Sequence, residues 1–337
     1  MIIENLHEHL CELGDRQLFF VVDGAVRQKC FELSPCITPE NTYILEAQES
    51  NKTLQAVQQI WNFLLEKQAT RNSVLVNIGG GIVCDIGGFC ASTYMRGMAY
   101  INVPTTLLAM VDAANGGKTG FNYKGIKNCV GVIQMPLQVW HYIPFLETLP
   151  RQELLSGWAE MLKHALLFSA NEWERVTHAM QNLTNLDKYT FASLVEQSCW
   201  IKERYVQDDV ADNGMRKALN FGHTVGHAVE EWQLSLGKTI PHGFAVMYGM
   251  VAELFLSVEK KHFPQTIFEQ LKEVWQTYYK TLPITPADYE TIIAWTHKDK
   301  KNTQTDQINC TLLADFSRPY VNQIVTEKEL KLAMENW

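Results

Sequence analysis

The chain has 337 residues, more than the roughly 250–300 at which a single hydrophobic core stops growing, so two lobes are expected. Hydrophobic residues make up 46% of the chain and charged residues 20%, a globular composition that excludes fibrous and disordered proteins. The formal net charge of −8 excludes broad electrostatic binding to nucleic acid or to an anionic membrane, because both need a basic face.

The beginning of the chain, Met1-Ile-Ile-Glu-Asn-Leu-His7, lacks the basic and apolar regions of a signal peptide. No apolar run reaches the about 18 residues of a membrane-spanning helix. The eight cysteines contain no Cys-x-x-Cys pair and mostly lie in apolar surroundings, which indicates reduced and mostly buried thiols. We therefore expect a cytoplasmic protein without a membrane or nucleic-acid partner.

Between Gln17 and about Trp140, short β-rich runs alternate with helical periodicities. The clearest apolar spacing at i, i+3 and i+4 predicts a helix over 54–65. Strands separated by crossover helices imply a mainly parallel, Rossmann-like wound sheet covered on both faces, so residues 1–150 are predicted to form an α/β lobe. The predicted strands are 18–22, 43–45, 74–78 and 100–103.

After Pro150 the pattern changes to long apolar periodicities with polar faces, so residues 151–337 are predicted to form a mainly α-helical lobe. One late strand is expected at 309–313. A cleft between the lobes is the expected ligand site. The predicted helical segments are 151–167, 185–206, 214–236, 243–262 and 266–281.

Three glycines, Gly79, Gly80 and Gly81, follow the predicted strand 74–78 and precede a helix-like segment. Glycines in this position let the backbone approach a phosphate, and the next helix offers free N–H groups. Cys84 stands where the third glycine of G-x-G-x-x-G is expected. A dinucleotide-binding turn and a merely tight strand-to-helix turn both remain open.

A second glycine-rich segment runs from Asp112 to Gly120 and is followed by Lys127 and Asn128. It lacks the first glycine of a Walker A sequence, but it combines two lysines, an amide and exposed backbone N–H groups. We therefore favour a binding site for a small polyanionic substrate over the alternative of a solvated turn.

Histidines in the helical lobe indicate a divalent-metal site. His223 and His227 are four residues apart and share one helical face, with glycines beside them. His242 precedes another predicted helix, and an acidic segment contains Glu160 and His164. Neutral imidazoles and a carboxylate are ligands of Zn²⁺, although the spacing alone leaves the ligand set open.

Eight motifs in one order, spread over about 165 residues, resemble 3-dehydroquinate synthase of the sugar phosphate cyclase superfamily. Weaker similarities at Asp23, Glu49 to Lys52 and Lys300 to Asn302 extend the resemblance to nearly the whole chain. The motifs are Gly79-Gly-Gly-Ile-Val-Cys-Asp85, Tyr94-Met-Arg-Gly97, Val103-Pro-Thr-Thr106, Val111-Asp112 with Gly116-Gly-Lys118, Lys127-Asn128, Ser156-Gly-x-Ala-Glu160-x-x-Lys163, Arg216 to Glu230, and His242-Gly243.

The resemblance assigns roles to residues throughout the chain. It implies that Glu160, His223 and His242 bind Zn²⁺, or Co²⁺ or another divalent metal, and that His227 is a substrate or proton-transfer residue. The implied catalytic residues are Lys118, Lys163, Lys202, Asp212, Arg216, Asn220 and His227. The implied substrate-binding residues are Arg96, Asp112, Lys127, Asn128 and either Lys300 or Lys301. The implied NAD-binding residues are Asp23, Glu49, Lys52, Gly80, Gly81, Asp85, Thr105, Thr106, Lys127 and Thr148.

The reaction implied by the resemblance converts 3-deoxy-D-arabino-heptulosonate 7-phosphate to 3-dehydroquinate and phosphate, in the shikimate pathway of aromatic amino acid biosynthesis. It proceeds by NAD-dependent transient oxidation, phosphate elimination, reduction and intramolecular aldol closure. Net redox is zero, so the cofactor is regenerated in each turnover. Arg96 is expected to reach the phosphate from a neighbouring subunit, which implies a homodimer.

The sequence departs from the family beside the last metal ligand. Phe244 stands where a Glu usually follows His242-Gly243, and loss of a carboxylate near a metal ligand is expected to weaken metal affinity about 10–100-fold. Ala113 and Ala114 replace the usual serines, and Asp212 stands where a Glu is usual.

Three alternatives accompany this interpretation. The first is another sugar phosphate cyclase, which Arg216, Asn220 and His227 together disfavour. The second is an NAD- and metal-dependent polyol or alcohol dehydrogenase, which would release NADH and would not need so many phosphate-binding bases. The third is a non-catalytic NAD-binding protein, which only Phe244 suggests.

Overall fold

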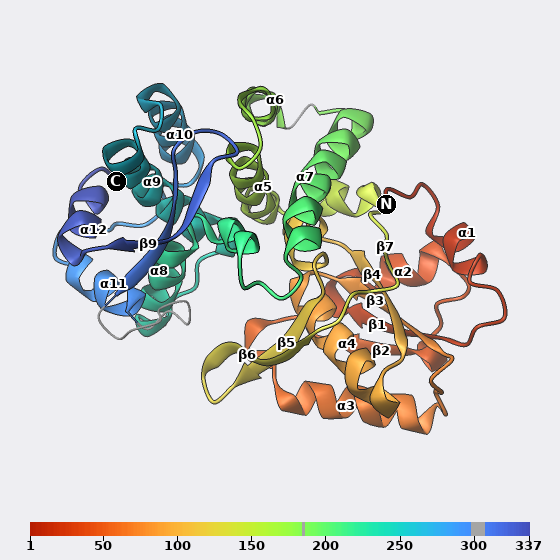
Figure 1. Ribbon diagram of the computed structural model, residues 1–337. Helices are drawn as coiled ribbons and strands as arrows, with labels where there is room; N and C mark the ends of the chain where they lie inside the picture. The colour runs from red at the N-terminus through yellow and green to blue at the C-terminus, as the bar shows by residue number, and fades with distance from the viewer. Residues whose placement is uncertain (184–185, 298–306) are drawn as a thin grey trace. The chain divides into compact units, whose positions relative to one another are not determined.

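The computed structural model describes residues 1–183, 186–297 and 307–337 (Figure 1). The chain divides into two compact units. The first consists of Met1–Pro150 with Asp187–Cys199, and the second of Arg151–Leu186 with Trp200–Trp337. The first unit is therefore not one continuous stretch, because the early part of helix α7 (Lys188–Asp208) belongs to it.

A parallel five-stranded sheet forms the centre of the first unit, in the order β2-β1-β3-β4-β7. The four predicted N-terminal strands are all present, which confirms the expected parallel α/β architecture. β7 has only two residues and is too short to give a recognisable pattern. The strands are β1 (Leu18–Asp23), β2 (Thr42–Leu45), β3 (Val74–Gly79), β4 (Ala99–Pro104) and β7 (Gln138–Val139).

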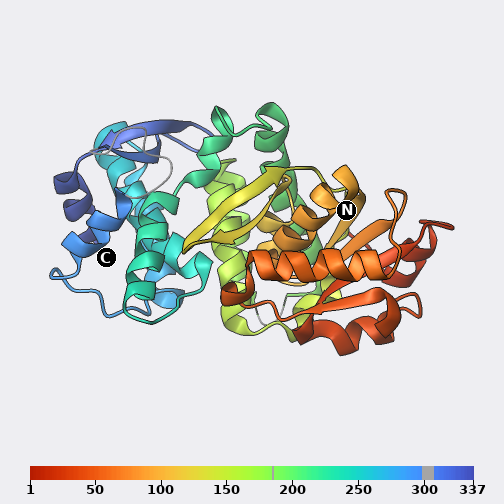
Figure 2. The same cartoon turned by 90° about the horizontal axis from the view of Figure 1, so that it is seen from below.

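The central strand of this sheet is buried on both faces. All six residues of β3 are buried, and successive side chains of a strand point to opposite faces. Helices α3 (Leu54–Glu66) and α4 (Gly81–Thr93) pack on the face that contains Phe19, Val21 and Leu75, and Figures 1 and 2 show both helices beside the strands. The short helices α1 (Leu6–Cys11) and α2 (Arg27–Leu33) complete the N-terminal part, and α2 contacts β1.

The glycine-rich segment after Asp112 forms more than the expected loop. A π-helical turn (Ala109–Ala113) leads through Gly116 and Gly117, which have φ of +88° and +69°, into an antiparallel hairpin of β5 (Lys118–Tyr123) and β6 (Ile126–Ile133). The sequence did not predict this hairpin, because β6 is mostly exposed and lacks the alternation of a half-buried strand.

The second unit is mainly helical, as predicted. It also contains an antiparallel hairpin whose first strand lies at the position expected for the late strand. Its helices are α5 (Arg151–Leu166), α6 (Ala170–Gln181), α8 (His223–Ser235), α9 (His242–Lys261), α10 (Gln265–Tyr278), α11 (Tyr289–Thr296) and α12 (Glu327–Met334), and its strands are β8 (Ile308–Leu313) and β9 (Pro319–Val325).

The predicted helix over 214–236 is interrupted in the structure. It consists of a 3₁₀-helix (Met215–Asn220) and α8, with Phe221 and Gly222 between them. Gly222 has a left-handed φ of +78°, which an L side chain rarely adopts. The break lets His223 begin a new helix.

Helix α9 is the centre of the second unit. It contacts α5, α8, α10, α12 and β8, and most of its residues are buried, as expected for a helix that is apolar all round. A Cβ at Gly249 would overlap the carbonyl oxygen of Gly222, and a Cβ at Gly243 would overlap that of Ser156. These glycines therefore allow α9 to approach the start of α8 and the backbone of α5 closely.

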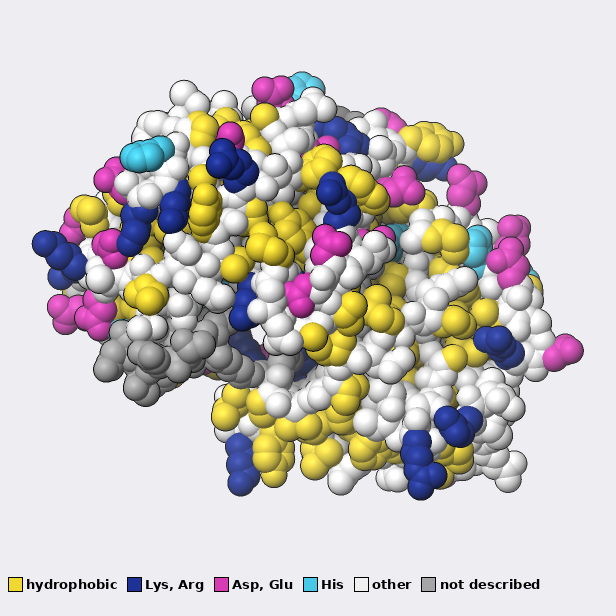
Figure 3. Space-filling view, viewed as in Figure 1, with side chains coloured by type: hydrophobic (Ala, Val, Ile, Leu, Met, Phe, Trp, Pro, Cys, Tyr) yellow, Lys and Arg dark blue, Asp and Glu magenta, His cyan; other side chains and the backbone are white. Residues whose placement is uncertain are grey.

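Among the described residues, no helix is long and apolar enough to cross a membrane. On the face shown in Figure 3, Lys and Arg side chains are interspersed with Asp and Glu. The face shown therefore has no broad basic area, in line with the net charge of −8 and with the expectation that an anionic ligand is bound by a local group of basic side chains.

Candidate active site

Three potential metal ligands meet in the second unit. Glu160 lies in the middle of α5, and His223 and His242 are the first residues of α8 and α9. One ligand atom from each lies within 4.8 Å of the other two. Glu160 Oε1 is 3.6 Å from His223 Nε2 and 3.9 Å from His242 Nε2.

The hydrogen bonds of the two histidines direct the same ring nitrogen toward Glu160. His223 Nδ1 lies 3.1 Å from the carbonyl oxygen of Phe221, and His242 Nδ1 lies 3.0 Å from Glu230 Oε1. Because a carbonyl and a carboxylate only accept, both Nδ1 atoms carry the hydrogen, and in the neutral imidazole it is then Nε2 that can bind a metal ion. Hydrogen bonding of the other ring nitrogen to a carboxylate or carbonyl is the usual support of a metal-bound histidine.

The buried carboxylate of Glu160 fits a cation. Its side chain is 0% exposed, and Oε1 has no hydrogen-bond partner in the described part of the chain. Lys163, one turn along α5, forms an ion pair with Oε2, which leaves Oε1 facing the histidines. Ligands about 2.0–2.2 Å from a tetrahedral zinc are about 3.3–3.6 Å apart, close to the separations seen here.

A second set of potential ligands shares His242. His227, Glu230 and His242 also have ligand atoms within 4.8 Å of one another. In this set Glu230 is already the acceptor for His242 Nδ1, whereas Glu160 Oε1 accepts no hydrogen bond from any residue that the structure describes. The chemistry therefore favours Glu160, His223 and His242, and leaves His227 beside them, with its ring centre 5.3 Å from that of His223.

The beginning of α8 is fixed by a residue that sequence reasoning missed. Glu253, fully buried on α9, accepts hydrogen bonds from the backbone N–H groups of Gly222 and Thr224, at 2.8 and 3.2 Å. It thereby caps the helix that His223 begins. A lone carboxylate within the apolar stretch of α9 was the available signal.

Glu230 was present in a recognised motif but was not assigned a role. The structure makes it the hydrogen-bond partner of His242, on the turn of α8 that follows His227. Glu230 follows His227 by three residues, so the two lie on the same side of α8. The contact between Glu230 and His242 depends on the packing of the chain and could not be predicted from this spacing.

Three expected basic residues are buried in the second unit. Lys163, Lys202 and Arg216 are exposed by 1%, 6% and 3%. Arg216 Nη1 donates to the carbonyl oxygen of Val210 at 2.9 Å, and its backbone N–H donates to Asp209. Asp212, with φ of +59°, lies in the loop that Asp209 organises, and Asn220 ends the 3₁₀-helix before His223.

Phe244 does not occupy a position beside His242. It is 3% exposed and packs edge to face on Tyr279, with ring centres 5.0 Å apart. Residues two apart on a helix point to nearly opposite sides, so the Phe244 ring is directed away from His242. The expected weakening of the metal site is not supported by this geometry, because Glu230 already accepts the hydrogen of His242 Nδ1.

Candidate dinucleotide-binding residues lie in the first unit, at the carboxyl ends of its strands. Gly79 ends β3 and Gly81 begins α4, which confirms the strand, glycine turn and helix predicted there. Asp23 ends β1 and accepts a hydrogen bond from the backbone N–H of Ala25. Burial raises the pKa of Asp23 above its ordinary value, against the opposing effect of the N–H groups of Ala25 and Gly80.

Lys52 joins two other predicted residues. It is buried and forms an ion pair with Asp85 of α4, and its Nζ also donates to Asn128 Oδ1, both at 2.5 Å. Burial raises the pKa of Asp85, while the nearby Lys52 ammonium opposes this shift. Glu49 accepts a hydrogen bond from Asn122 of β5, so the loop at residues 49–52 and the β5–β6 hairpin are connected.

The remaining predicted residues of the first unit are more dispersed. Thr105 is buried after β4, and Thr106 Oγ1 accepts a hydrogen bond from the backbone N–H of Ala109. Lys118 and Lys127 lie on the hairpin, and Asp112 lies in the π-helical turn. Arg96 and Thr148 are exposed in 3₁₀-helices. Lys300 and Lys301 lie outside the described residues.

Comparison with known proteins agrees with the resemblance. Residues 42–156 match the family model of the 3-dehydroquinate synthase N-terminal domain, and residues 157–302 match that of the C-terminal domain. The chain is 41% identical over 331 residues to the 3-dehydroquinate synthase of Parabacteroides distasonis, covering 96% of this chain and 92% of that protein.

Two solved structures share the fold across nearly the whole chain. One is a 2-epi-5-epi-valiolone synthase from Streptomyces hygroscopicus with NAD⁺ and Zn²⁺ bound, at a TM-score of 0.86 and 23% identity. The other is a 2-deoxy-scyllo-inosose synthase complexed with carbaglucose-6-phosphate, NAD⁺ and Co²⁺, at a TM-score of 0.84 and 20% identity. Each alignment covers 99% of this chain and 95% of the other. These structures agree in fold, and the two consecutive domain matches with the 41% identity show that the chain belongs to the 3-dehydroquinate synthase family.

Proposed function

We propose that the protein is an NAD- and divalent-metal-dependent lyase that converts 3-deoxy-D-arabino-heptulosonate 7-phosphate to 3-dehydroquinate and phosphate. Family membership supports the reaction, since the relative with 41% identity is named 3-dehydroquinate synthase. The observation that carries the proposal is the convergence of Glu160, His223 and His242, with both imidazole Nε2 atoms turned toward a buried carboxylate oxygen.

The proposed metal ligands are Glu160, His223 and His242, with Zn²⁺ as the first candidate and Co²⁺ as an alternative. NAD, when bound, supplies a reversible hydride acceptor, and the metal ion supplies a Lewis acid for substrate oxygens. Three protein ligands are typical of a catalytic zinc, because further positions stay open for substrate. The two structurally similar cyclases were solved with NAD⁺ and with Zn²⁺ or Co²⁺, which supports this assignment.

Buried basic side chains explain how an acidic protein can bind a multiply charged anion. We assign Lys163, Lys202 and Arg216 to the carboxylate, hydroxyls and phosphate of the substrate. A guanidinium and ammonium groups held with little exposure bind oxyanions more strongly than exposed ones, because water screens them less. Further contacts to the substrate are assigned to Asp112, Lys118, Lys127, Asn128, Asp212 and Asn220.

His227 is proposed to move a proton at the leaving phosphate oxygen. Its ring lies beside those of His223 and His242, at centroid distances of 5.3 and 6.0 Å, on the turn of α8 that follows the first ligand. Imidazole titrates near neutral pH and can give or take a proton during turnover. A positioned proton donor commonly contributes about 10²–10⁴-fold in rate.

The proposed NAD-binding residues belong to the first unit. Asp23, Gly80, Gly81, Asp85, Thr105, Thr106 and Thr148 follow or flank the strands of the parallel sheet, and Glu49, Lys52 and Lys127 belong to the connected loop and hairpin. The N-terminal turn of α4 presents backbone N–H groups to a pyrophosphate, as at many dinucleotide sites.

A phosphate-release assay with the heptulosonate substrate, NAD⁺ and Zn²⁺ tests the proposed function. We expect phosphate to appear without accumulation of NADH, because the hydride returns in each turnover. Glu160→Gln should abolish activity together with metal binding, whereas His227→Asn should retain the metal and lose most activity. Steady NADH formation matched to substrate consumption would instead identify a dehydrogenase.

Another sugar phosphate cyclase is the second candidate, because two cyclases with other products share the fold. Identification of the product by mass spectrometry, with the heptulosonate and a hexose phosphate offered separately, distinguishes the two. Release of phosphate from the hexose phosphate alone would favour the second candidate.

We also propose that the protein is a cytoplasmic homodimer in which Arg96 acts in the partner's site. Arg96 is exposed and has φ of +67°, so it lies at the surface in a tight turn. Mixing inactive Arg96→Ala and His227→Asn variants under exchange conditions should partly restore activity, since one site of each mixed dimer then has both side chains. No restoration in verified mixed dimers would contradict the shared site.

A further inference from the structure

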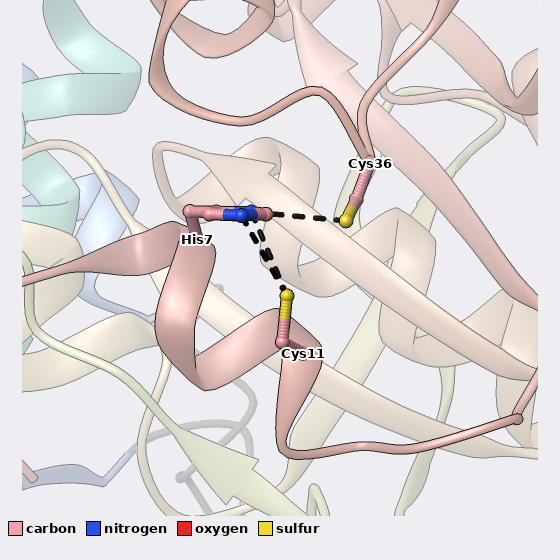
Figure 4. Close-up of side chains that lie close together, drawn as sticks. All are labelled: His7, Cys11 and Cys36. Carbon is pink, nitrogen blue, oxygen red and sulfur yellow. Dashed lines mark hydrogen bonds between the residues drawn. The ribbon is translucent and has the colours of Figure 1, made fainter.

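A cluster of two cysteines and a histidine lies near the start of the chain, in the first unit. His7 and Cys11 belong to α1, one turn apart, and Cys36 lies between α2 and β2 (Figure 4). One ligand atom from each lies within 4.8 Å of the other two. None of the three belongs to the proposed metal and NAD sites.

The distances match those between ligands of one ion. His7 Nδ1 is 3.7 Å from Cys11 Sγ and 3.8 Å from Cys36 Sγ. Figure 4 shows the imidazole ring edge-on, with Cys36 Sγ beyond its end and Cys11 Sγ to one side of the ring plane. Cys11 Sγ is equally distant, at 3.7 Å, from Nδ1 and Nε2, so a rotation of the His7 or Cys11 side chain brings the three ligand atoms around one ion. With bonds of about 2.3 Å to sulfur and about 2.0–2.1 Å to nitrogen, a tetrahedral zinc places such atoms roughly 3.6 Å apart.

The backbone that carries the three side chains is held by other contacts. Asn5 caps α1 by accepting a hydrogen bond from the backbone N–H of His7 at 3.0 Å, and α1 packs through buried Leu6 and Leu10. The backbone N–H of Cys36 donates to Ser34 Oγ, and Asn41 donates to the carbonyl oxygen of Cys36. The backbone of the cluster is therefore in place before any ion binds, and only side-chain rearrangement is required.

Without an ion, the nitrogen proposed as a ligand has a hydrogen-bond partner. The Ser34 hydroxyl lies 3.0 Å from His7 Nδ1 and hydrogen-bonds to that nitrogen. A divalent cation relieves the repulsion between two thiolates, and binding releases their protons.

We propose that His7, Cys11 and Cys36 form a second metal site, which binds one thiophilic divalent ion such as Zn²⁺ through two thiolates and one neutral imidazole. Two thiol protons are released when the ion binds, and no oxidation takes place. Since Cys11 is exposed and Cys36 and His7 are partly exposed, a water molecule completes the coordination. The Ser34 hydroxyl gives up its bond to His7 Nδ1.

Cobalt(II) provides a spectroscopic test that separates this site from Glu160 and its histidines. Thiolate ligands give Co²⁺ an intense near-ultraviolet charge-transfer band, which carboxylate and imidazole ligands do not give. The reduced, metal-stripped full-length protein is loaded with Co²⁺, and we expect this band. Glu160→Gln should keep it, and Cys11→Ser and Cys36→Ser should each abolish it.

Cys129→Ser is the matched control, because Cys129 is exposed but lies outside the cluster, and it should retain the band. Circular dichroism verifies that each variant folds. Zinc analysis should give one equivalent less for folded Cys11→Ser than for the wild type. Absence of the band from the wild type, or its survival in Cys11→Ser, would overturn the site. A disulfide between Cys11 and Cys36 that forms in the presence of two equivalents of Zn²⁺, enough for both sites, would overturn it as well.

Discussion

His242 shows how two neighbouring carboxylates can have different roles at one imidazole. Glu230 accepts the Nδ1 hydrogen at 3.0 Å, while Glu160 Oε1 faces Nε2 at 3.9 Å. The first interaction fixes the tautomer and the orientation of the ring, and the second leaves space for an ion. The functional difference between the two glutamates therefore follows from which ring nitrogen each one contacts.

Glu230→Gln should weaken metal binding without abolishing it. Gln can still accept the hydrogen of His242 Nδ1, but it lacks the charge that makes the imidazole a stronger ligand, so we expect an about 10–100-fold loss in Zn²⁺ affinity. Competition with a chromogenic chelator measures this loss. Glu259→Gln, at an exposed position of α9, is the control. Complete loss of the ion in Glu230→Gln, with retention in Glu160→Gln, would favour His227, Glu230 and His242 as ligands.

Phe244→Glu should destabilise the protein rather than strengthen its metal site. Phe244 is 3% exposed and packs on Tyr279, so a carboxylate there would be buried in an apolar contact. We expect a loss of at least about 3 kcal/mol in the free energy of unfolding, against about 1 kcal/mol for Phe244→Leu. Urea unfolding measures both. A more stable Phe244→Glu protein that also holds zinc longer would contradict the observed orientation.

At the scale of elements, close helix packing places the histidines. Gly249 of α9 lies against the backbone of Gly222, immediately before His223, and Glu253 one turn further caps the same helix. A side chain at Gly249 would push α8 away from α9. The position of His223 therefore depends on a glycine far from it in sequence.

Gly249→Ala should impair both stability and metal binding. The added methyl group would meet backbone atoms, which cannot rotate away, and overpacking of this kind costs typically about 1–3 kcal/mol. Urea unfolding and zinc affinity should both fall, whereas Glu259→Ala on the exposed side of α9 should change neither by much. Unchanged zinc affinity in Gly249→Ala would show that the helices separate without displacing His223.

An ion pair between α9 and α12 predicts a pH dependence. Lys260 donates to Glu329 at 2.6 Å, and this bond with the N–H of Thr326 lowers the pKa of Glu329 to about 2. In the unfolded chain, Glu329 has an ordinary pKa of about 4.3. Because folding lowers this pKa, the ionised carboxylate stabilises the folded state above about pH 4.3, and this stabilisation is lost as the pH falls toward 2. The stability difference between wild type and Glu329→Gln in urea should therefore shrink over that range. A difference independent of pH would contradict the prediction.

At the scale of the whole molecule, the sequence predicts elements where burial is regular. β1, β3 and β4 are rich in buried apolar residues, and α3, α5, α9 and α10 have the expected helical periodicity. The β5–β6 hairpin escapes prediction because its second strand is exposed, and α7 is divided between the units although its sequence periodicity is continuous. Local sequence patterns therefore predict single helices and strands well, but they do not predict to which compact unit an element belongs.

The candidate site could be predicted in kind but not in detail. The histidines indicated a metal, yet their spacing left His223, His227 and His242 open, and the choice came from the family resemblance. Geometry supports that choice through the orientation of the ring nitrogens, which no sequence pattern contains. The cluster of His7, Cys11 and Cys36 gave no signal, because Cys36 is distant in sequence and no Cys-x-x-Cys pair is present.

Metal and cofactor binding should be separable by mutation, because the proposed ligands of the two groups come from different units. Glu160, His223 and His242 all belong to the second unit, and Asp23 belongs to the first. In Asp23→Asn the side chain can still accept from Ala25 but loses its charge, so NAD⁺ affinity should fall about tenfold while Zn²⁺ affinity is unchanged. In Glu160→Gln, Zn²⁺ binding should be lost while NAD⁺ affinity is unchanged. Calorimetric titration of both variants in a Cys11→Ser background, which removes the N-terminal cluster, measures each affinity separately. Loss of Zn²⁺ binding in Asp23→Asn, or of NAD⁺ binding in Glu160→Gln, would show that the two groups depend on each other for binding.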